Sequence, residues 1–153
     1  TQAGYLSSSY PINNFSERAD GFYKAIRKSG LSPSRSIVHR LTPSAEGAYS
    51  DMLELLDRGE ELARCYFADN DLIAAGAMRA LTERGKRIPQ DVAVVGFDDM
   101  PLCAYTSPTL TTVRVPKQEM GRAAAKRLLD KIKDGLPPVK IEVGTSLIRR
   151  TSA

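Results

Sequence analysis

Short apolar runs alternate along the chain with longer stretches in which apolar residues recur three to four positions apart. The short runs predict strands, and the longer stretches predict amphipathic helices. The expected strands cover residues 3–6, 36–41, 64–68, 92–97, 110–115 and 139–149. The expected helices cover residues 14–29, 45–58, 72–84 and 118–134, and each is followed by a glycine, at positions 30, 59, 85 and 135. Glycine readily takes the left-handed conformation with which many helices end.

The order of these elements indicates the fold class. Up to residue 97, strands and helices alternate with short connections, which is typical of a parallel sheet with helices on its faces. The run 92–97 is apolar throughout, as expected for a strand that is buried on both faces. We therefore expect an α/β protein with a three-layer, doubly wound and mainly parallel sheet.

One predicted helix is apolar on nearly all sides. Between Leu72 and Leu81, the only charged residue is Arg79. A helix that packs on one face of a sheet needs only an apolar stripe, so the second apolar side of this helix must also be covered. The pattern leaves two interpretations open: a contact with another subunit, or a central helix covered by its neighbours in the same chain.

The composition is that of an ordinary globular domain and excludes several classes of protein. The chain has 153 residues, of which 42% are hydrophobic and 26% are charged, enough for one hydrophobic core. No apolar run is long enough to span a membrane, and the chain does not open with the pattern of a signal peptide. Cys65 and Cys103 cannot form a disulfide framework, and the single histidine, His39, excludes sites that need two histidine ligands.

The chain is basic, with 22 Lys and Arg against 18 Asp and Glu, so the net charge is 22 − 18 = +4. Such an excess suggests a nucleic-acid partner. However, several basic residues, among them Lys131 and Lys133, stand in the last turn of a predicted helix, where a cation interacts favourably with the helix dipole. We favour this interpretation over a DNA-binding face on this chain.

Polar residues follow the predicted strands at their carboxyl ends, where open parallel sheets bind ligands. Serines follow the first strand, Asn70 follows the third, Asp98 follows the fourth, and Arg18 lies in the first helix. Hydroxyl, amide, carboxylate and guanidinium groups together match a small molecule rich in hydroxyl or amino groups. Asp71 is expected to be only a helix cap, whereas Asn70 and Asp98 lie at the turns themselves.

Motifs of several enzyme classes are missing. The sequence has no G-x-G-x-x-G, no P-loop and no G-x-S-x-G elbow. The pairs Asp69/Asp71 and Asp98/Asp99 offer oxygen ligands for Mg²⁺, but serines stand after the first strand, where phosphotransfer folds of this shape usually have an acidic residue. His39 lies within a predicted strand and is interpreted as structural.

Five motifs in order resemble one family. They are ERADGF at 17–22, YFADNDLIAAGA at 66–77, IPQDVAVVGFDD at 88–99, PTLTTV at 108–113 and RRTS at 149–152. Each is weak alone, but together they span almost the whole chain. The sequence resembles the effector-binding region of the lac repressor family of bacterial transcription regulators, which share a periplasmic-binding-protein-like fold.

The resemblance implies a domain organisation. Residues 1–113 and 139–153 are expected to form the C-terminal effector-binding subdomain, and residues 114–138 to be a returning segment of an N-terminal subdomain that is otherwise absent. The helix-turn-helix that binds operator DNA in the family is also absent from this chain. We expect the helix 118–134 to lack its native sheet, and therefore to pack against a second copy, to swap or to be poorly ordered.

The resemblance also implies a function without catalysis, cofactor or metal. A small polar effector, such as a sugar or a sugar derivative, is expected to bind at Arg18, Asn70 and Asp98 and to change the affinity of a dimer for its operator. Asn14 and Phe15 are weaker candidates for effector contacts. Relatives place an aromatic residue after the second strand to stack on the effector; here residues 41–43 are Leu-Thr-Pro, so Phe15 or Tyr10 is the alternative stacking group.

Relatives dimerise through elements that correspond to the helix from Leu72 to Leu81 and the loop from Pro101 to Tyr105, which favours the interface interpretation of that helix. The family implies a cytoplasmic protein with no membrane partner. Two alternatives remain: a sugar-binding protein of a transport system, which shares the fold, and a Mg²⁺-dependent phosphotransfer enzyme that uses Asp69, Asp71 and Asp98.

Overall fold

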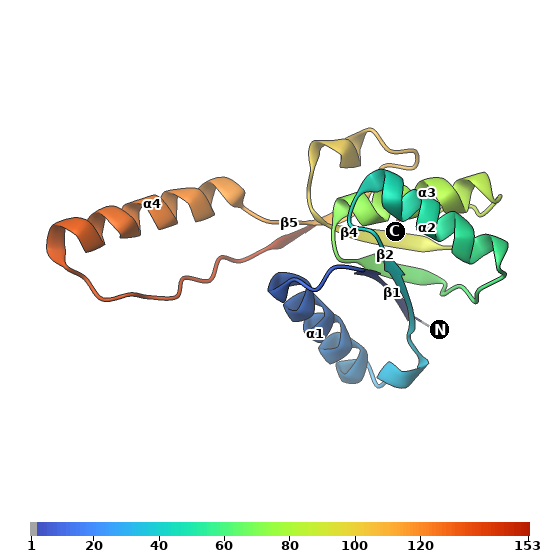
Figure 1. Cartoon of the computed structure of the whole chain (residues 1–153), viewed down its shortest axis with the longest axis horizontal. Helices are drawn as coiled ribbons and strands as arrows, with labels where there is room; N and C mark the ends of the chain where they lie inside the picture. The colour runs from blue at the N-terminus through green and yellow to red at the C-terminus, as the bar shows by residue number, and fades with distance from the viewer. Residues whose placement is uncertain (1–2) are drawn as a thin grey trace.

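A computed structural model describes residues 3–153 and contains one six-stranded sheet with the strand order β2-β1-β3-β4-β5-β6 (Figure 1). The first five strands in this order are parallel, and β6 is antiparallel to β5. The strands are β1 (Ala3–Ser8), β2 (Ile37–Leu41), β3 (Cys65–Ala68), β4 (Ala93–Asp98), β5 (Thr111–Arg114) and β6 (Ser146–Ile148). The mainly parallel sheet confirms the expected α/β class.

The helices lie on both faces of the sheet. They are α1 (Asn13–Lys28), α2 (Ala45–Asp57), α3 (Asp71–Glu83) and α4 (Lys117–Asp134), with short 3₁₀ helices η1 (Pro33–Arg35) and η2 (Pro101–Ala104). α1 covers one face of the sheet, and α2 and α3 together cover the other, which gives the three expected layers (Figure 1).

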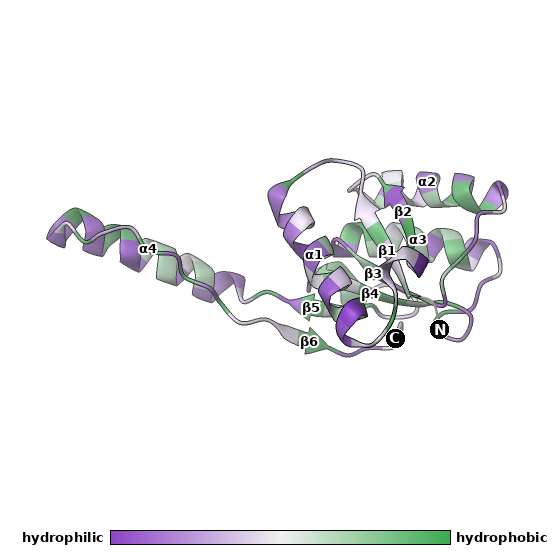
Figure 2. Cartoon of the chain, turned by 90° about the horizontal axis from the view of Figure 1, so that it is seen from below, coloured by the Kyte–Doolittle hydropathy of each residue, from purple (hydrophilic) through white to green (hydrophobic). Residues whose placement is uncertain are grey.

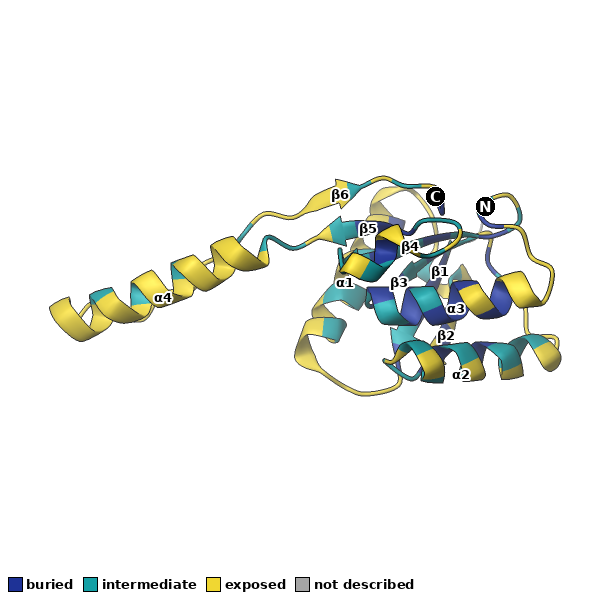
Figure 3. Cartoon of the chain, turned by 90° about the horizontal axis from the view of Figure 1, so that it is seen from above, coloured by how far each residue is buried: buried dark blue, intermediate teal, exposed yellow. Residues whose placement is uncertain are grey.

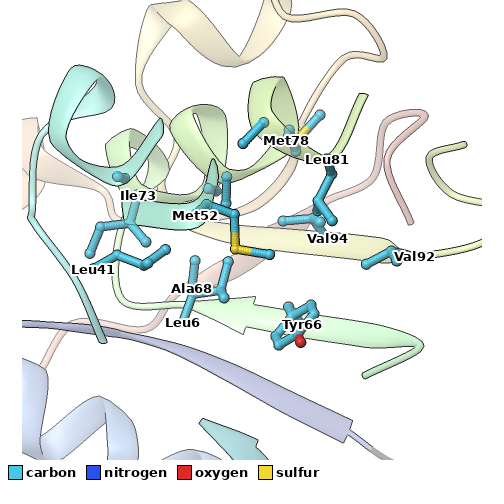
Figure 4. Close-up of a cluster of buried hydrophobic side chains, with 14 of the residues drawn as sticks. Leu6, Leu41, Met52, Tyr66, Ala68, Ile73, Met78, Leu81, Val92 and Val94 are labelled. Atoms are coloured by element: carbon cyan, nitrogen blue, oxygen red, sulfur yellow. The ribbon is translucent and has the colours of Figure 1, made fainter. Parts of the chain in front are cut away.

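The main core lies between the sheet and the pair α2/α3 (Figure 4). Alternate residues of the strands point into it, among them Leu6, Leu41, Ala68 and Val94, each with no exposed side-chain surface. Ile73 of α3 closes the cluster from the helix side. Burial of a large aliphatic side chain contributes about 1.5–3 kcal/mol, so this cluster supplies a large part of the stabilisation.

Close packing of α2 against α3 explains why the helix from Leu72 to Leu81 is apolar on two sides. Gly76 lies against the backbone of α2, where an added Cβ atom would be 2.3 Å from the carbonyl oxygen of Ala45. One side of α3 therefore faces the sheet and a second side faces α2. Arg79 is exposed, in line with its position as the charged residue of the stretch.

α4 lies apart from the three-layer body, at the end of a stem formed by β5 and β6 (Figures 1 and 2). No residue of this fully described helix is buried, and Leu128 and Ile132 are 58% and 71% exposed (Figure 3). The prediction of a strand over 139–149 is wrong for most of its length, because only Ser146–Ile148 pairs with β5. The preceding residues run back beside α4, where no neighbouring strand is available for pairing.

Within residues 3–153, none of the helices combines the length and the hydrophobicity needed to span a bilayer.

Candidate functional site

Three of the predicted site residues come together at the carboxyl edge of the parallel sheet. Arg18 belongs to α1, Asn70 follows β3, and Asp98 is the last residue of β4. β3 and β4 are neighbours in the sheet, so their ends lie side by side, and α1 brings Arg18 over them. The fold thus produces the convergence that the strand-end pattern predicts.

Arg18 is the centre of this group. Its Nη1 donates a hydrogen bond to the carbonyl oxygen of Asp69, and its Nη2 lies 3.9 Å from Oδ1 of Asp98. The guanidinium lies 3.9 Å from the centroid of the Phe97 ring and 5.3 Å from that of Phe15. Such cation–π contacts contribute about 0.5–2 kcal/mol and hold the planar group in a fixed orientation. Only 15% of the side chain is exposed, so Arg18 is presented in one place.

Asp98 offers a carboxylate with free acceptor capacity. In the part of the chain that the structure describes, no hydrogen bond reaches its carboxylate, and its ion pair with Arg18 is long. Burial raises the pKa of Asp98, while the charges of Arg18 and Lys117 act in the opposite direction. A half-buried carboxylate with open lone pairs and a cation beside it is suited to accept hydrogen bonds from hydroxyl groups.

Asn70 has a structural role as well as a place in the site. It is the N-cap of α3, and its Oδ1 accepts a hydrogen bond from the backbone N–H of Ile73 at 2.9 Å. This cap uses the amide oxygen and leaves the amide nitrogen as a donor.

The prediction that Asp71 caps this helix is wrong. Asp71 lies inside α3, and its carboxylate accepts hydrogen bonds from the backbone N–H of Met100 at 2.7 Å and from Thr112 Oγ1 at 2.5 Å. The cap position falls to Asn70 because that residue keeps the extended backbone that an N-cap requires, at φ −155° and ψ 174°.

Asp69 holds several residues of this edge in place through contacts that the sequence did not indicate. Its carboxylate is buried and accepts hydrogen bonds from the Tyr5 hydroxyl and, at 2.6 Å, from the backbone N–H of Ser8. Its carbonyl accepts the bond from Arg18. Burial raises the pKa of Asp69, against the lowering effect of these hydrogen bonds and of the Arg18 charge. The one sequence signal is an acidic residue placed directly after a buried strand.

Of the two weaker candidates, the structure places Phe15 near the site and leaves Asn14 without a contact there. Phe15 is half-buried below the Arg18 guanidinium, whereas Asn14 is exposed on the first turn of α1. Tyr10 is 59% exposed and lines a hollow of about 280 Å³ next to Phe15. Phe15 and Tyr10 are thus two aromatic side chains of this edge that line a concave surface.

The carboxylates proposed for Mg²⁺ do not form a shared site. Among residues 3–153, no three His, Cys, Asp or Glu side chains form a group that could hold a metal. The Asp69 carboxylate faces Tyr5 and Ser8, and the Asp71 carboxylate faces Met100 and Thr112. Each of them is satisfied by donors of the protein itself.

Relatives of this chain are named as transcription regulators. Residues 3–153 match the family model of the periplasmic binding protein-like domain. The HTH-type transcriptional regulator GalS of Salmonella typhimurium is 42% identical over 126 residues, which make up 82% of this chain and 37% of that protein. The solved complex of the transcriptional regulator CelR with cellobiose has a TM-score of 0.88 and 31% identity, over 99% of this chain and 46% of that one.

A crystal structure of the lac repressor dimer bound to operator and an anti-inducer is also similar, with a TM-score of 0.88 and 26% identity over 99% of this chain and 52% of that one. These similarities confirm the resemblance drawn from the five sequence motifs. The chain spans less than half the length of the curated relatives that it matches.

Proposed function

The chain belongs to the periplasmic-binding-protein-like domain family, and from this premise we propose that it is the effector-sensing part of a DNA-binding transcription regulator. The observation that carries the proposal is the ion pair of Arg18 with Asp98 at one edge of the sheet, where Asn70 directly follows the carbonyl that Arg18 contacts. The group can donate and accept hydrogen bonds, which suits it to bind a polar ligand.

The effector that fits this site is a small molecule with several hydroxyl groups. Arg18 and the Asn70 amide supply donors, and the open Asp98 carboxylate accepts from pairs of hydroxyls. The Phe15 and Tyr10 rings are available to pack against the apolar face of a sugar ring. A sugar or a sugar derivative is therefore the proposed effector, and the cellobiose complex of CelR supports this class.

We propose that residues 1–113 and 139–153 form the C-terminal subdomain of the effector-binding region, and that residues 114–138 belong to a second subdomain. The isolated position of α4 supports the boundary after β5, because the apolar side chains of α4 have no sheet to cover (Figure 3). Residues 139–145 run back beside α4, so their place in the C-terminal subdomain rests on the family pattern alone. The effector lies between the two subdomains and stabilises one arrangement of them. Differential binding of the effector to two arrangements then changes the affinity for operator DNA.

We further propose that the regulator is a homodimer in the cytoplasm, where it meets its operator. The proposed dimer surface is the outer side of α3 together with the loop from Pro101 to Tyr105. A hollow of about 490 Å³ lies between the start of α2, α3 and residues 106–107, and Tyr105, which precedes these residues in the chain, is 87% exposed. The lac repressor dimer among the similar structures supports this assembly.

Isothermal titration of the chain with cellobiose, lactose, D-ribose and D-galactose tests the effector proposal. We expect saturable binding of at least one sugar, and a loss of about tenfold in affinity for Arg18→Lys, because an ammonium group cannot replace the guanidinium fork. The matched control is Arg87→Lys, which alters an exposed ion pair with Asp91. Absence of saturable binding for all four sugars would contradict the effector proposal.

A further inference from the structure

Two chain crossings connect the α4 arm, defined as residues 115–145, to the three-layer body. The chain leaves the body at Arg114, the last residue of β5, and returns to it through β6 (Figure 2). These two strands pair with each other, with Arg114 opposite Ser146. The orientation of the α4 arm therefore depends on what holds this pair of strands against the body.

Asp99 contacts the strands on both sides of the stem. Its Oδ2 accepts a hydrogen bond from Nε of Arg114 at 2.6 Å, and its Oδ1 accepts one from Nη2 of Arg150 at 2.7 Å. Arg150 follows β6, and its Nη1 donates at 2.7 Å to the carbonyl oxygen of Leu110, which precedes β5. One carboxylate thus joins the outgoing strand, the segment after the returning strand and the loop after β4.

The Asp99 carboxylate is well suited to this role. Its side chain is 10% exposed and that of Arg150 is 20% exposed, so solvent screens the ion pair only weakly. Burial alone raises the pKa of Asp99, but the hydrogen bonds from Arg150 and Arg114 outweigh burial and lower the pKa below its usual value. The carboxylate is therefore ionised at neutral pH and accepts charge-assisted hydrogen bonds, which are stronger than neutral ones.

Asp99 also directly follows a residue of the proposed effector site in the sequence. Its chain neighbour is Asp98, which faces Arg18 and pairs in register with Arg114 of β5. Asp98 and Asp99 are the two non-glycine residues in the described chain with φ in the left-handed range, at 114° and 49°. Such backbone conformations are energetically costly and are kept only where surrounding contacts fix them. We therefore expect a movement of Asp98 to move the backbone of Asp99 as well.

We propose that Asp99 is a positioning residue that couples occupancy of the Arg18/Asp98 site to the orientation of the α4 arm. A hydroxyl group bound to Asp98 shifts the 98–99 turn, and Asp99 transmits this shift to Arg114 and Arg150. The coupling to effector occupancy rests on the proposed function, whereas the role of Asp99 in holding the α4 arm rests on its contacts with Arg114 and Arg150.

The test measures the distribution of distances between the body and the α4 arm in the full chain. Dyes are placed through unnatural amino acids at Glu60 and Lys133, both of which are exposed. Asp99→Asn keeps the size and the backbone tolerance of the residue and removes its charge. We expect the distribution in this variant to widen about twofold relative to wild type, since charge-assisted bonds hold the stem.

A second variant and a matched control keep the test decisive. Arg114→Gln removes one half of the contact from a side chain that is 54% exposed, so it leaves the core intact, and the distribution is expected to widen as for Asp99→Asn. Asp91→Asn makes the same chemical change in the exposed Arg87 pair at the opposite end of β4, and the distribution is expected to stay as in wild type. Distributions in Asp99→Asn and Arg114→Gln equal to wild type would overturn the proposal, whatever the effect on melting temperature.

The coupling itself is measured with whichever of cellobiose, lactose, D-ribose and D-galactose binds the wild-type chain. That sugar is expected to shift the mean distance in wild type and in Asp91→Asn, and to leave it unchanged in Asp99→Asn, with sugar affinities within about threefold of each other. An equal shift in Asp99→Asn would refute the coupling and leave the effector proposal standing. If none of the four sugars binds, the effector proposal and the coupling both fail, while the widths of the distributions still decide whether Asp99 holds the α4 arm.

Discussion

The Arg18 guanidinium lies 3.9 Å from the Asp98 carboxylate, although Arg18 comes from the first helix and Asp98 ends the fourth strand. This distance is longer than a hydrogen bond, so the two groups attract each other without satisfying each other. A polar ligand can therefore form hydrogen bonds with the donors and acceptors that these two neighbouring groups leave unused. The relationship between these two side chains is therefore the basis of the proposed effector site.

Asn70 combines capping and binding, and two substitutions separate these roles. Serine also caps helices, so Asn70→Ser is expected to change the free energy of unfolding by only about 0.3 kcal/mol, whereas Asn70→Ala is expected to cost about 1 kcal/mol. Both variants lose the amide nitrogen and are expected to bind the sugar more weakly by a similar factor. Chemical denaturation and titration calorimetry check this pair of results. Wild-type sugar affinity in Asn70→Ser would show that the amide makes no contact with the effector.

Asp69 makes stability depend on pH. Burial raises the pKa of Asp69 in the folded protein above that in the unfolded chain, so the folded state takes up the proton more readily. The stability contribution of Asp69 is therefore fully present below the unfolded pKa and is lost as the pH rises through the folded pKa. The free energy of unfolding of wild type minus that of Asp69→Asn is expected to increase as the pH falls from 7 towards 4.

Urea denaturation of both proteins at several pH values measures this difference. Asp91→Asn serves as a control with the opposite sign, because the Arg87 contact lowers the pKa of Asp91. A difference for Asp69→Asn that is flat or that decreases at low pH would contradict the assignment.

Gly76 fixes the distance between α2 and α3. A Cβ atom there would lie 2.3 Å from the Ala45 carbonyl oxygen and 2.8 Å from the Tyr49 nitrogen, both of which are backbone atoms. Gly76→Ala is therefore expected to destabilise the protein by about 1–3 kcal/mol through overpacking. In α1, nothing lies within 4 Å of a Cβ atom added to Gly21, so Gly21→Ala is expected to stabilise the helix by about 0.5–1 kcal/mol. Thermal denaturation of both variants checks the opposite signs.

Tyr105 tests the proposed dimer. Its ring is 87% exposed next to the hollow on the outer side of α3, and exposed tyrosines at interfaces often contribute much of the binding energy. Tyr105→Ala is expected to raise the dissociation constant of the dimer about tenfold, which corresponds to about 1.4 kcal/mol. Analytical ultracentrifugation measures this constant, with Leu31→Ala, at the end of α1 and 42% exposed, as control. Equal constants for wild type and both variants would place the interface elsewhere.

Local periodicity was sufficient to predict most of the fold. The alternation of apolar runs and helical stretches predicted the parallel sheet and its two helical layers, because each element buries one face of its own. It failed at residues 139–145, where the apolar residues Val139 and Ile141 resemble a strand but have no neighbouring strand to pair with. Pairing is a property of the surrounding fold, which a pattern along the chain does not contain.

The arrangement of the candidate site was predictable only in part. Strand ends and family motifs predicted that Arg18, Asn70 and Asp98 lie at one edge of the sheet, because the carboxyl ends of neighbouring parallel strands must lie together. They did not predict that Asp69 holds Tyr5 and Ser8 or that Asp99 holds Arg114 and Arg150. These partners depend on how the strands are ordered in the sheet, and a single sequence does not state that order.

Mapping of amide chemical-shift changes tests the central claim most directly, because NMR detects weak binding at millimolar sugar. The full chain is titrated with cellobiose, lactose, D-ribose and D-galactose, and the same titrations are repeated with Asp98→Asn. The account predicts that saturable changes gather around Arg18, Asn70 and Asp98 and that they weaken at least about tenfold in Asp98→Asn. Changes that gather on another surface, or that are the same in Asp98→Asn, would contradict it.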